Sequence, residues 1–184
     1  QLFERDIEAW QDLRSKCVSS VAPMGPSPLL RDYAAQLDCA ARMLKNEAGT
    51  AFPWAPGFSH APPLQWHESI AAERAYVLLW IAAEHAQSAS WESRSTSESL
   101  KRAANEFQLA AGCLAHMTAV SLPAPLQDQV PCLRFLMLAQ AQECFWQKAV
   151  QDALKDTTIA KLAQGVSTLY ADSVALAARA ALPP

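Results

Sequence analysis

The stretch LAQAQECFWQKAVQDALKDTTIAKLAQ, residues Leu138 to Gln164, decides how the chain is interpreted. Two apolar runs with helical spacing lie on either side of a Lys155–Asp156 pair, which is typical of two consecutive helices. The first run places a Phe-Trp pair beside Cys144 and Glu143. This segment is consistent with a catalytic constellation, with a buried helix, or with a surface that holds a partner.

The composition favours a helical domain. Of the 184 residues, 51% are hydrophobic and 18% are charged, which argues against disorder. Only 5 glycines are present, and good helix formers dominate. The net charge is −3 and no large basic run occurs, so nucleic-acid binding through a phosphate-neutralising patch is disfavoured.

The cysteines and the most apolar stretch bear on the cellular compartment. AYVLLWIAA, residues 75–83, is flanked by charged residues and is too short to span a bilayer. The 5 cysteines are odd in number and form no C-x-x-C pattern, which suggests small hydrophobes in a reducing compartment. The chain starts at Gln1 without a secretory signal, so we interpret it as a fragment of a larger cytoplasmic protein.

The hydrophobic periodicity predicts an all-α fold, an antiparallel helical stack in one domain. A stretch rich in proline, residues 49–66, is predicted to be a long loop whose aromatic side chains pack on the helices. The six predicted helices are residues 2–18, 29–45, 69–90, 98–118, 133–150 and 156–181. We expect Asp156 or Thr157 to cap the last of them.

No familiar catalytic or metal-binding motif occurs. Glycine-rich nucleotide-binding loops, nucleophile elbows and H-E-x-x-H pairs are absent from the sequence. His60 and His67, with Glu68, come nearest to a metal cluster, but a zinc site needs three or four convergent ligands. We therefore interpret them as loop histidines and expect neither a metal nor a cofactor.

Cys144 beside Glu143 resembles a nucleophile and a base. Adjacent positions on a helix point about 100° apart, so the two side chains do not face each other. Cys144 instead continues an apolar stripe that we expect to be buried, and a buried thiol is inert. The other members of the stripe are Leu126, Val130, Leu133, Met137 and Ala141.

Phe145 lies on the shoulder of the same helix, roughly 80° from the centre of the stripe. If the last two helices form an antiparallel hairpin, Phe145 lies opposite Thr158 and Leu162, and Lys148 and Lys161 border this spot. An apolar spot edged by lysines suits an amphipathic partner helix with an acidic side. The alternative is that these residues contact the next helix of the stack.

Several blocks of the sequence resemble a known family. LAQAQECFWQKAV followed by KDTTIAKLAQGVSTLY is similar to the signature of the BRO-one domain, which is found in ALIX-type scaffold proteins of the ESCRT pathway. ERAYVLLWIAAEHAQSAS and SLKRAANEFQLAAGCLAHM agree with it in order and spacing. YAAQLDCAARMLKNEAGTAFPWAP resembles most closely the fungal PalA-type pH-response members. The likeness covers about residues 29–175.

The resemblance implies a curved helical domain with a core like tetratricopeptide repeats and no enzymatic activity. It also implies an apolar patch that binds the C-terminal amphipathic helix of the main ESCRT-III filament subunit. The patch would comprise Phe145, Thr158 and Leu162, with Lys101 and Lys148 as polar neighbours, and Ser97 at a position that is acidic in some relatives.

The likeness to PalA-type proteins implies a bridge that brings a PacC-type transcription factor to ESCRT-III on endosomes. The resemblance thus implies a cytoplasmic adaptor recruited to endosomes through its partners, in pH signalling or in multivesicular-body sorting. Thr158 replaces what is often a larger aliphatic residue, so we expect a shallower patch. Residues 1–184 would be about half of the domain, and the transcription factor would bind a downstream V-shaped domain.

Two alternatives to this function remain. One is a structural helical-repeat fragment without binding of its own, and the other is a cysteine- or metal-dependent hydrolase.

Overall fold

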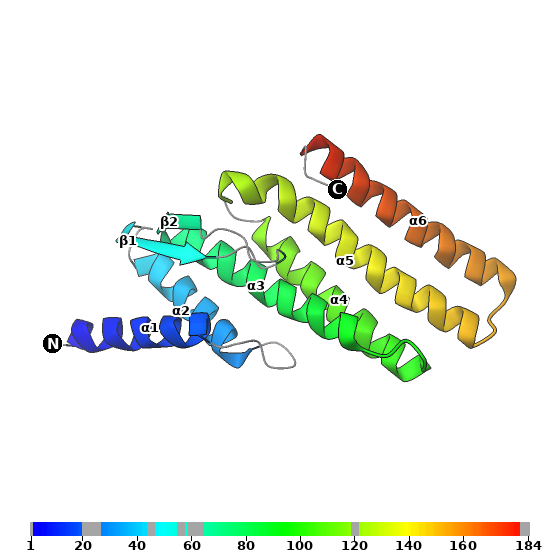
Figure 1. The fold of residues 1–184 in the computed structure, drawn as a ribbon, viewed down its shortest axis with the longest axis horizontal. Coiled ribbons are helices and arrows are strands. Elements are labelled where there is room, and N and C mark those ends of the chain that lie inside the picture. The colour runs from blue at the N-terminus through cyan, green and yellow to red at the C-terminus, as the bar shows by residue number, and fades with distance from the viewer. Residues whose placement is uncertain are drawn as a thin grey trace. The chain divides into compact units, whose positions relative to one another are not determined.

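The computed structural model describes residues 2–19, 27–43, 47–54, 58, 65–118 and 122–180, and these contain six helices and one two-stranded sheet (Figure 1). The predicted helical class is therefore confirmed. The helices are α1 (Leu2–Ser19), α2 (Pro28–Met43), α3 (Ile70–Trp91), α4 (Ser97–Met117), α5 (Ala124–Gln151) and α6 (Asp156–Arg179). The strands are β1 (Glu47–Trp54) and β2 (Gln65–Ser69). None of the helices in these ranges combines the length and the apolarity that crossing a bilayer requires.

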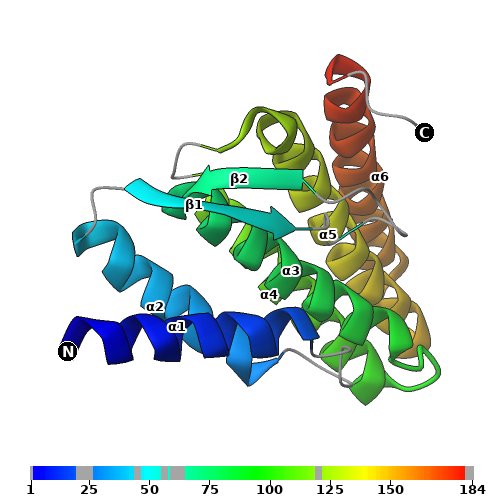
Figure 2. The ribbon, with the colours of Figure 1, turned by 60° about the vertical axis from the view of Figure 1, so that its left-hand side comes forward.

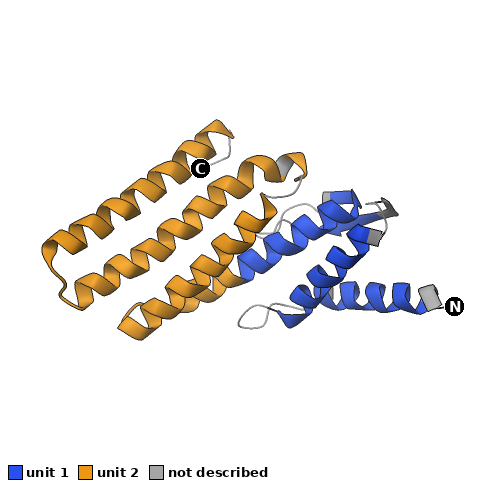
Figure 3. Cartoon of the chain, turned by 180° about the vertical axis from the view of Figure 1, so that it is seen from behind, with its two compact units in different colours: residues 1–84 blue, residues 85–184 orange. Residues whose placement is uncertain are grey.

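The chain divides into two compact units, which Figure 3 shows in different colours. Unit 1 comprises residues 1–84, with α1, α2, the sheet and most of α3. Unit 2 comprises residues 85–184, with the end of α3 and all of α4, α5 and α6. Each unit has its own internal packing.

Unit 1 is organised around one buried carboxylate, Glu73 of α3, whose side chain is inaccessible to solvent. Arg14 of α1 donates its Nε–H to Glu73 Oε1 at 2.9 Å, and the Tyr33 hydroxyl of α2 donates to the same oxygen at 2.7 Å. The Trp54 indole of β1 donates to Glu73 Oε2. Burial, followed by the charge of Glu73, raises the pKa of Tyr33 far above its ordinary value. Four elements of unit 1 thus meet at one side chain.

The predicted long loop is wrong in part, because both of its ends belong to the antiparallel hairpin of β1 and β2 (Figure 2). Phe52 and Trp54 point to one face of the strand and are buried, as the prediction of packed aromatics requires. Trp66 does not pack and is 66% exposed. Pro53 fits because in a two-stranded sheet each strand is an edge, where a missing N–H is tolerated. His60 lies outside the described residues.

In unit 2, α4 packs on α5 and α5 packs on α6, as consecutive antiparallel neighbours (Figures 1 and 3). The start of α4 carries a capping box, in which the Thr96 side chain accepts from the Ser99 N–H at 3.1 Å and the Ser99 hydroxyl accepts from the Thr96 N–H. This pairing satisfies backbone donors that the first helical turn leaves free. The inward face of α4 is formed by Leu100, Ala103, Ala104, Phe107, Ala110, Ala111 and Leu114.

Helix α5 begins at Ala124 rather than at the predicted residue 133, and Pro131 lies inside it. Proline is favoured in the first helical turn but removes a hydrogen bond from a helix interior. Leu126 and Val130 are nevertheless buried at 1% and 0% exposure. Burial of this apolar turn therefore outweighs the local cost of Pro131.

The start of α6 also differs from the prediction. Lys155 occupies the N-cap position, and no side chain caps the helix. Asp156 lies in the first turn instead, where a negative charge interacts favourably with the helix dipole. The predicted cap by Asp156 or Thr157 is therefore wrong.

Candidate functional site

Two hydrogen bonds and one close approach indicate the register between α5 and α6. The Ser173 hydroxyl donates to the Cys132 carbonyl oxygen at 3.1 Å, and the Tyr170 hydroxyl donates to Glu143 Oε2 at 2.7 Å. Near the middle of the pair, a Cβ added to Gly165 would lie 3.4 Å from the Gln142 side chain. With this register, Phe145 is level with Leu162, and Lys148 is level with Thr158, about one helical turn further along.

Four of the six residues predicted for the patch lie on α5 and α6, and the helical spacing places them toward one side of this pair. Leu138 and Phe145 lie seven positions apart on α5, and Leu162 and Leu169 lie seven positions apart on α6, so each pair shares one side of its helix. All four side chains are half-buried, whereas Thr158 is exposed. We call this side the Phe145 face; it comprises Arg134, Leu138, Phe145 and Lys148 of α5 and Thr158, Leu162 and Leu169 of α6.

The predicted polar neighbours already have charged partners. Lys148 forms an ion pair with Asp152, one turn further along α5. Lys101 of α4 lies 3.6 Å from a carboxylate oxygen of Glu98, and both side chains are largely exposed. Solvent-exposed pairs of this kind contribute little to stability, so a partner carboxylate can replace Glu98 at low cost.

Ser97 is the first residue of α4 and is half-buried. The cap itself is formed by the preceding residue, Thr96. The Ser97 side chain is therefore not needed to start the helix.

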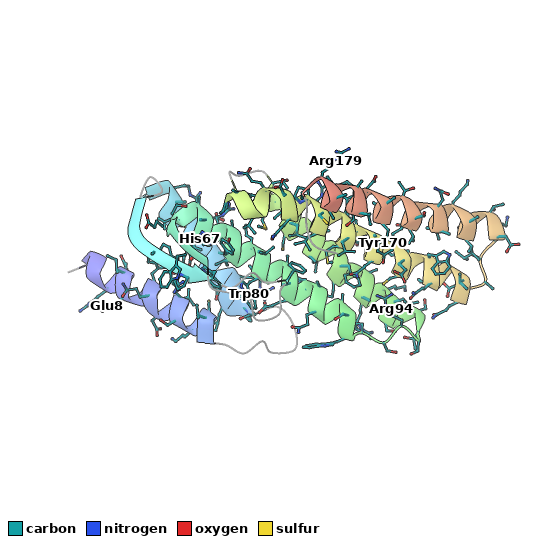
Figure 4. All side chains as sticks on the ribbon, turned by 45° about the horizontal axis from the view of Figure 1, so that its top comes forward. Glu8, His67, Trp80, Arg94, Tyr170 and Arg179 are labelled. Carbon is teal, nitrogen blue, oxygen red and sulfur yellow. The ribbon has the colours of Figure 1, made fainter. Side chains whose placement is uncertain are left out.

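Glu143 lies on the opposite side of the α5–α6 pair from the Phe145 face. It accepts hydrogen bonds from Gln147 Nε2 at 3.0 Å and from Tyr170, and Arg94 Nη1 lies 3.4 Å away (Figure 4 labels Arg94 and Tyr170). Burial and the hydrogen bond to Glu143 raise the pKa of Tyr170 to about 12. Glu143 thus joins α5, α6 and the segment before α4, which is a structural role.

Cys144 is 1% exposed and belongs to the core stripe, as predicted. Leu126, Val130, Met137 and Ala141 on that stripe are buried as well, whereas Leu133, which was also expected to be buried, is half-buried. Burial raises the pKa of the Cys144 thiol, which disfavours the nucleophilic thiolate at neutral pH. Cys144 and Glu143 therefore do not form a nucleophile and base.

His67, which flanks the predicted loop, lies on β2 (Figure 4 labels it). Its ring stacks on that of Tyr76, with the centroids 4.1 Å apart. Its Nε2 atom is buried without a hydrogen-bond partner among the described residues. Burial lowers the pKa of His67, which favours the neutral ring in this contact. Glu68, next in the strand, is exposed. His67 is therefore part of the packing of unit 1.

Arg134 was not among the site residues predicted from the sequence. The spacing could have indicated it, because Arg134, Leu138 and Phe145 follow one another at intervals of four and seven positions on one side of α5. The predicted start of the helix at residue 133 placed Arg134 at a helix end and so concealed this continuity.

Comparison with known proteins identifies the family. The family profile described as the BRO1-like domain matches residues 1–183. The chain belongs to the BRO1-like domain family. The resemblance seen in the sequence blocks is thereby confirmed, and no catalytic family is indicated.

Three relatives place the chain within the BRO1-like family. It is 40% identical over 184 residues to the pH-response regulator protein palA/RIM20 of Emericella nidulans, covering 94% of this chain and 22% of that protein. It is 35% identical over 128 residues to the vacuolar protein-sorting protein bro-1 of Neurospora crassa, covering 67% of this chain and 12% of that protein. A solved ALIX BRO1 CHMP4C complex matches with a TM-score of 0.78 and 26% identity, covering 94% of this chain and 54% of that one. The chain thus spans about a fifth of the length of its curated palA/RIM20 relative.

Proposed function

We propose that this BRO1-like chain is a non-enzymatic scaffold module that binds the C-terminal amphipathic helix of an ESCRT-III filament subunit. The observation that carries the proposal is the pairing of Phe145 with Leu162, two half-buried apolar side chains at the same level of adjacent helices. The similarity to an ALIX BRO1 domain solved with CHMP4C, an ESCRT-III subunit, supports it.

The chemistry of the Phe145 face suits such a ligand. An amphipathic helix recognises its site through apolar side chains at positions i, i+3, i+4 and i+7. Leu138, Phe145, Leu162 and Leu169 offer partly exposed apolar surface at matching intervals along α5 and α6. Thr158 presents a small, exposed side chain, so the contact there is shallow and the expected affinity is modest.

The proposal extends to the longer protein of which this chain resembles a part. Such a protein links the endosomal ESCRT machinery to ambient-pH signalling or to multivesicular-body sorting. It is recruited from the cytoplasm to endosomes through its partners. A PacC-type transcription factor would bind outside residues 1–184. The palA/RIM20 and vacuolar-sorting relatives support these two pathways.

A titration tests the binding proposal. A labelled synthetic ESCRT-III tail helix is titrated with the wild-type chain and with Phe145→Asp. Loss of a buried aromatic anchor costs on the order of 2 kcal/mol or more, so we expect at least about a thirtyfold weaker affinity. Val174→Asp is the matched control, because Val174 is a 67% exposed apolar residue of α6 that lies away from the Phe145 face.

Equal affinities for Phe145→Asp and wild type would overturn the proposal and favour a purely structural helical fragment. Circular dichroism of each variant shows that the helices persist. A loss confined to Val174→Asp would place the binding surface on the outer side of α6 and would contradict the proposal as well.

The non-enzymatic part of the proposal has its own test. Thiol labelling at neutral pH is expected to modify Cys39, which is exposed, before Cys17 and Cys144, which are buried. Burial raises the pKa of Cys17 to about 11 and also raises that of Cys144. Rapid labelling of native Cys144 would indicate an activated thiol and would contradict the proposal.

A further inference from the structure

We propose that the docking surface continues along α5 to Arg134, and that the Arg134 guanidinium takes a carboxylate of the bound helix. This inference rests on the proposed function and deepens it. It assigns to Arg134 a specificity role that the sequence did not suggest, and it sets the position of an acidic residue in the ligand.

The geometry of α5 supports this continuation. Arg134 precedes Phe145 by eleven positions, which is about three helical turns and a rise of about 16 Å. The two side chains therefore lie on nearly the same side of the helix, with half-buried Leu138 between them. On α6, Leu162 and Leu169 run beside this row in the antiparallel direction. A bound helix of three to four turns would span the row.

The charge of Arg134 is available to a ligand. Arg134 forms no ion pair with any described residue, and Asp172, at the same level of α6, is not paired with it. By contrast, Lys148 is paired with Asp152, and Lys101 lies near Glu98. Binding a carboxylate at Arg134 therefore displaces no internal partner.

Arg134 is also held in place better than a lysine would be. Its guanidinium carbon lies 5.9 Å from the centroid of the Phe135 ring, and the side chain is half-buried. A planar guanidinium that rests on an aromatic ring keeps its N–H donors free for a bidentate carboxylate contact. Lys161, which also lacks an ion pair among the described residues, is exposed and has a flexible stem.

The expected ligand is therefore an amphipathic helix of a partner protein. Its apolar side chains cover Leu138 and Phe145, and it carries a Glu or Asp about three turns from the residue that contacts Phe145. Charge pairs at the edge of an interface act mainly on the association rate and on its salt dependence. Arg134 should accordingly affect affinity less than Phe145 does and should lose its effect at high salt.

The test compares Arg134→Glu and Arg134→Gln with wild type in titrations of the synthetic ESCRT-III tail helix at low and at high salt. At low salt we expect Arg134→Glu to weaken binding about tenfold and Arg134→Gln less, with both differences shrinking at high salt. The matched control is Arg31→Glu, which makes the same change of charge at an exposed position of unit 1. A tail helix with its acidic residue reversed to Arg should recover affinity for Arg134→Glu.

The outcomes separate the two proposals. If Phe145→Asp abolishes binding while Arg134→Glu behaves like Arg31→Glu, the Arg134 inference is overturned and the proposed function stands. If Phe145→Asp has no effect, the proposed function and the inference that rests on it are both overturned. Circular dichroism of the Arg134 variants checks that α5 persists.

Discussion

The two units use their polar and aromatic side chains in opposite ways. Unit 1 directs Arg14, Tyr33 and Trp54 inward onto Glu73, so these groups are occupied by the fold. The α5–α6 pair of unit 2 leaves Phe145 and Arg134 partly exposed on one side. The contrast teaches that a residue type alone does not indicate function. What matters is whether the fold already supplies its partner.

The largest loss of stability is expected when the hydrogen-bond network around Glu73 is broken. Replacing Glu73 by Ala leaves the Arg14 charge and the Tyr33 and Trp54 donors without their acceptor. Breaking a buried ion pair from one side costs about 3 to 5 kcal/mol, so we expect the urea midpoint of unfolding to fall sharply. Glu68→Ala, at an exposed position of β2, is the control and should leave the midpoint unchanged. Similar midpoints for the two variants would show that Glu73 does not organise unit 1.

A smaller loss of stability is expected on the Glu143 side of the α5–α6 pair, which lies opposite the Phe145 face. Tyr170→Phe removes the hydrogen bond to Glu143, and a bond to a charged group such as a carboxylate contributes about 1.5 to 3 kcal/mol. Because this side is separate from the Phe145 face, affinity for the tail helix should not change. Chemical denaturation and the titration together check both expectations. A large loss of affinity would contradict the separation of the two sides.

The same variant has a distinct pH dependence. The pKa of Tyr170 is raised in the folded state from 10.0 to about 12, so folding favours the protonated phenol. The stabilisation is complete below pH 10 and is lost as pH rises toward 12, because the unfolded state releases the proton first. The stability difference between wild type and Tyr170→Phe should therefore shrink between pH 10 and 12. A difference that stays constant over this range would contradict the assignment.

The smallest loss of stability concerns two adjacent residues at the start of α4. Thr96 caps the helix, whereas Ser97 is a proposed ligand residue. Thr96→Ala removes the capping box of α4 and should lower stability by about 1 kcal/mol. Ser97→Ala should leave stability nearly unchanged, because Ser97 is not the cap. Thermal unfolding of the two variants measures this. Equal losses would show that Ser97 also supports the helix start.

The sequence predicted the helices of unit 2 well, because their periodicity is carried by the residues that become buried. Cys144 and its stripe on α5 are the clearest case. The prediction of helix bounds was wrong where tertiary packing overrode the local conformational preference of the sequence. The helix was predicted to start at residue 133, after Pro131, whereas α5 starts at Ala124 and buries Leu126 and Val130.

The β1–β2 hairpin of unit 1 was not predicted, for another reason. β1 contains Gly49 and Pro53, which are poor strand formers, and its pairing with β2 is irregular between Glu47 and Phe52. Such a strand depends on its partner strand and on the burial of Phe52 and Trp54, and neither is visible in local sequence. Of the candidate site, the sequence predicted the Phe145–Leu162 pairing, but Arg134 required the full extent of α5.

The central claim is that the Phe145 face, and not another surface, holds the partner helix. Photo-crosslinking tests this most directly, with a diazirine placed at an apolar anchor position of the ESCRT-III tail helix and the modified residues located by mass spectrometry. If the partner helix lies on the Phe145 face, crosslinks should form to α5 between Arg134 and Lys148 and to α6 near Leu162. Crosslinks confined to unit 1, or to the outer side of α6 around Val174, would contradict it.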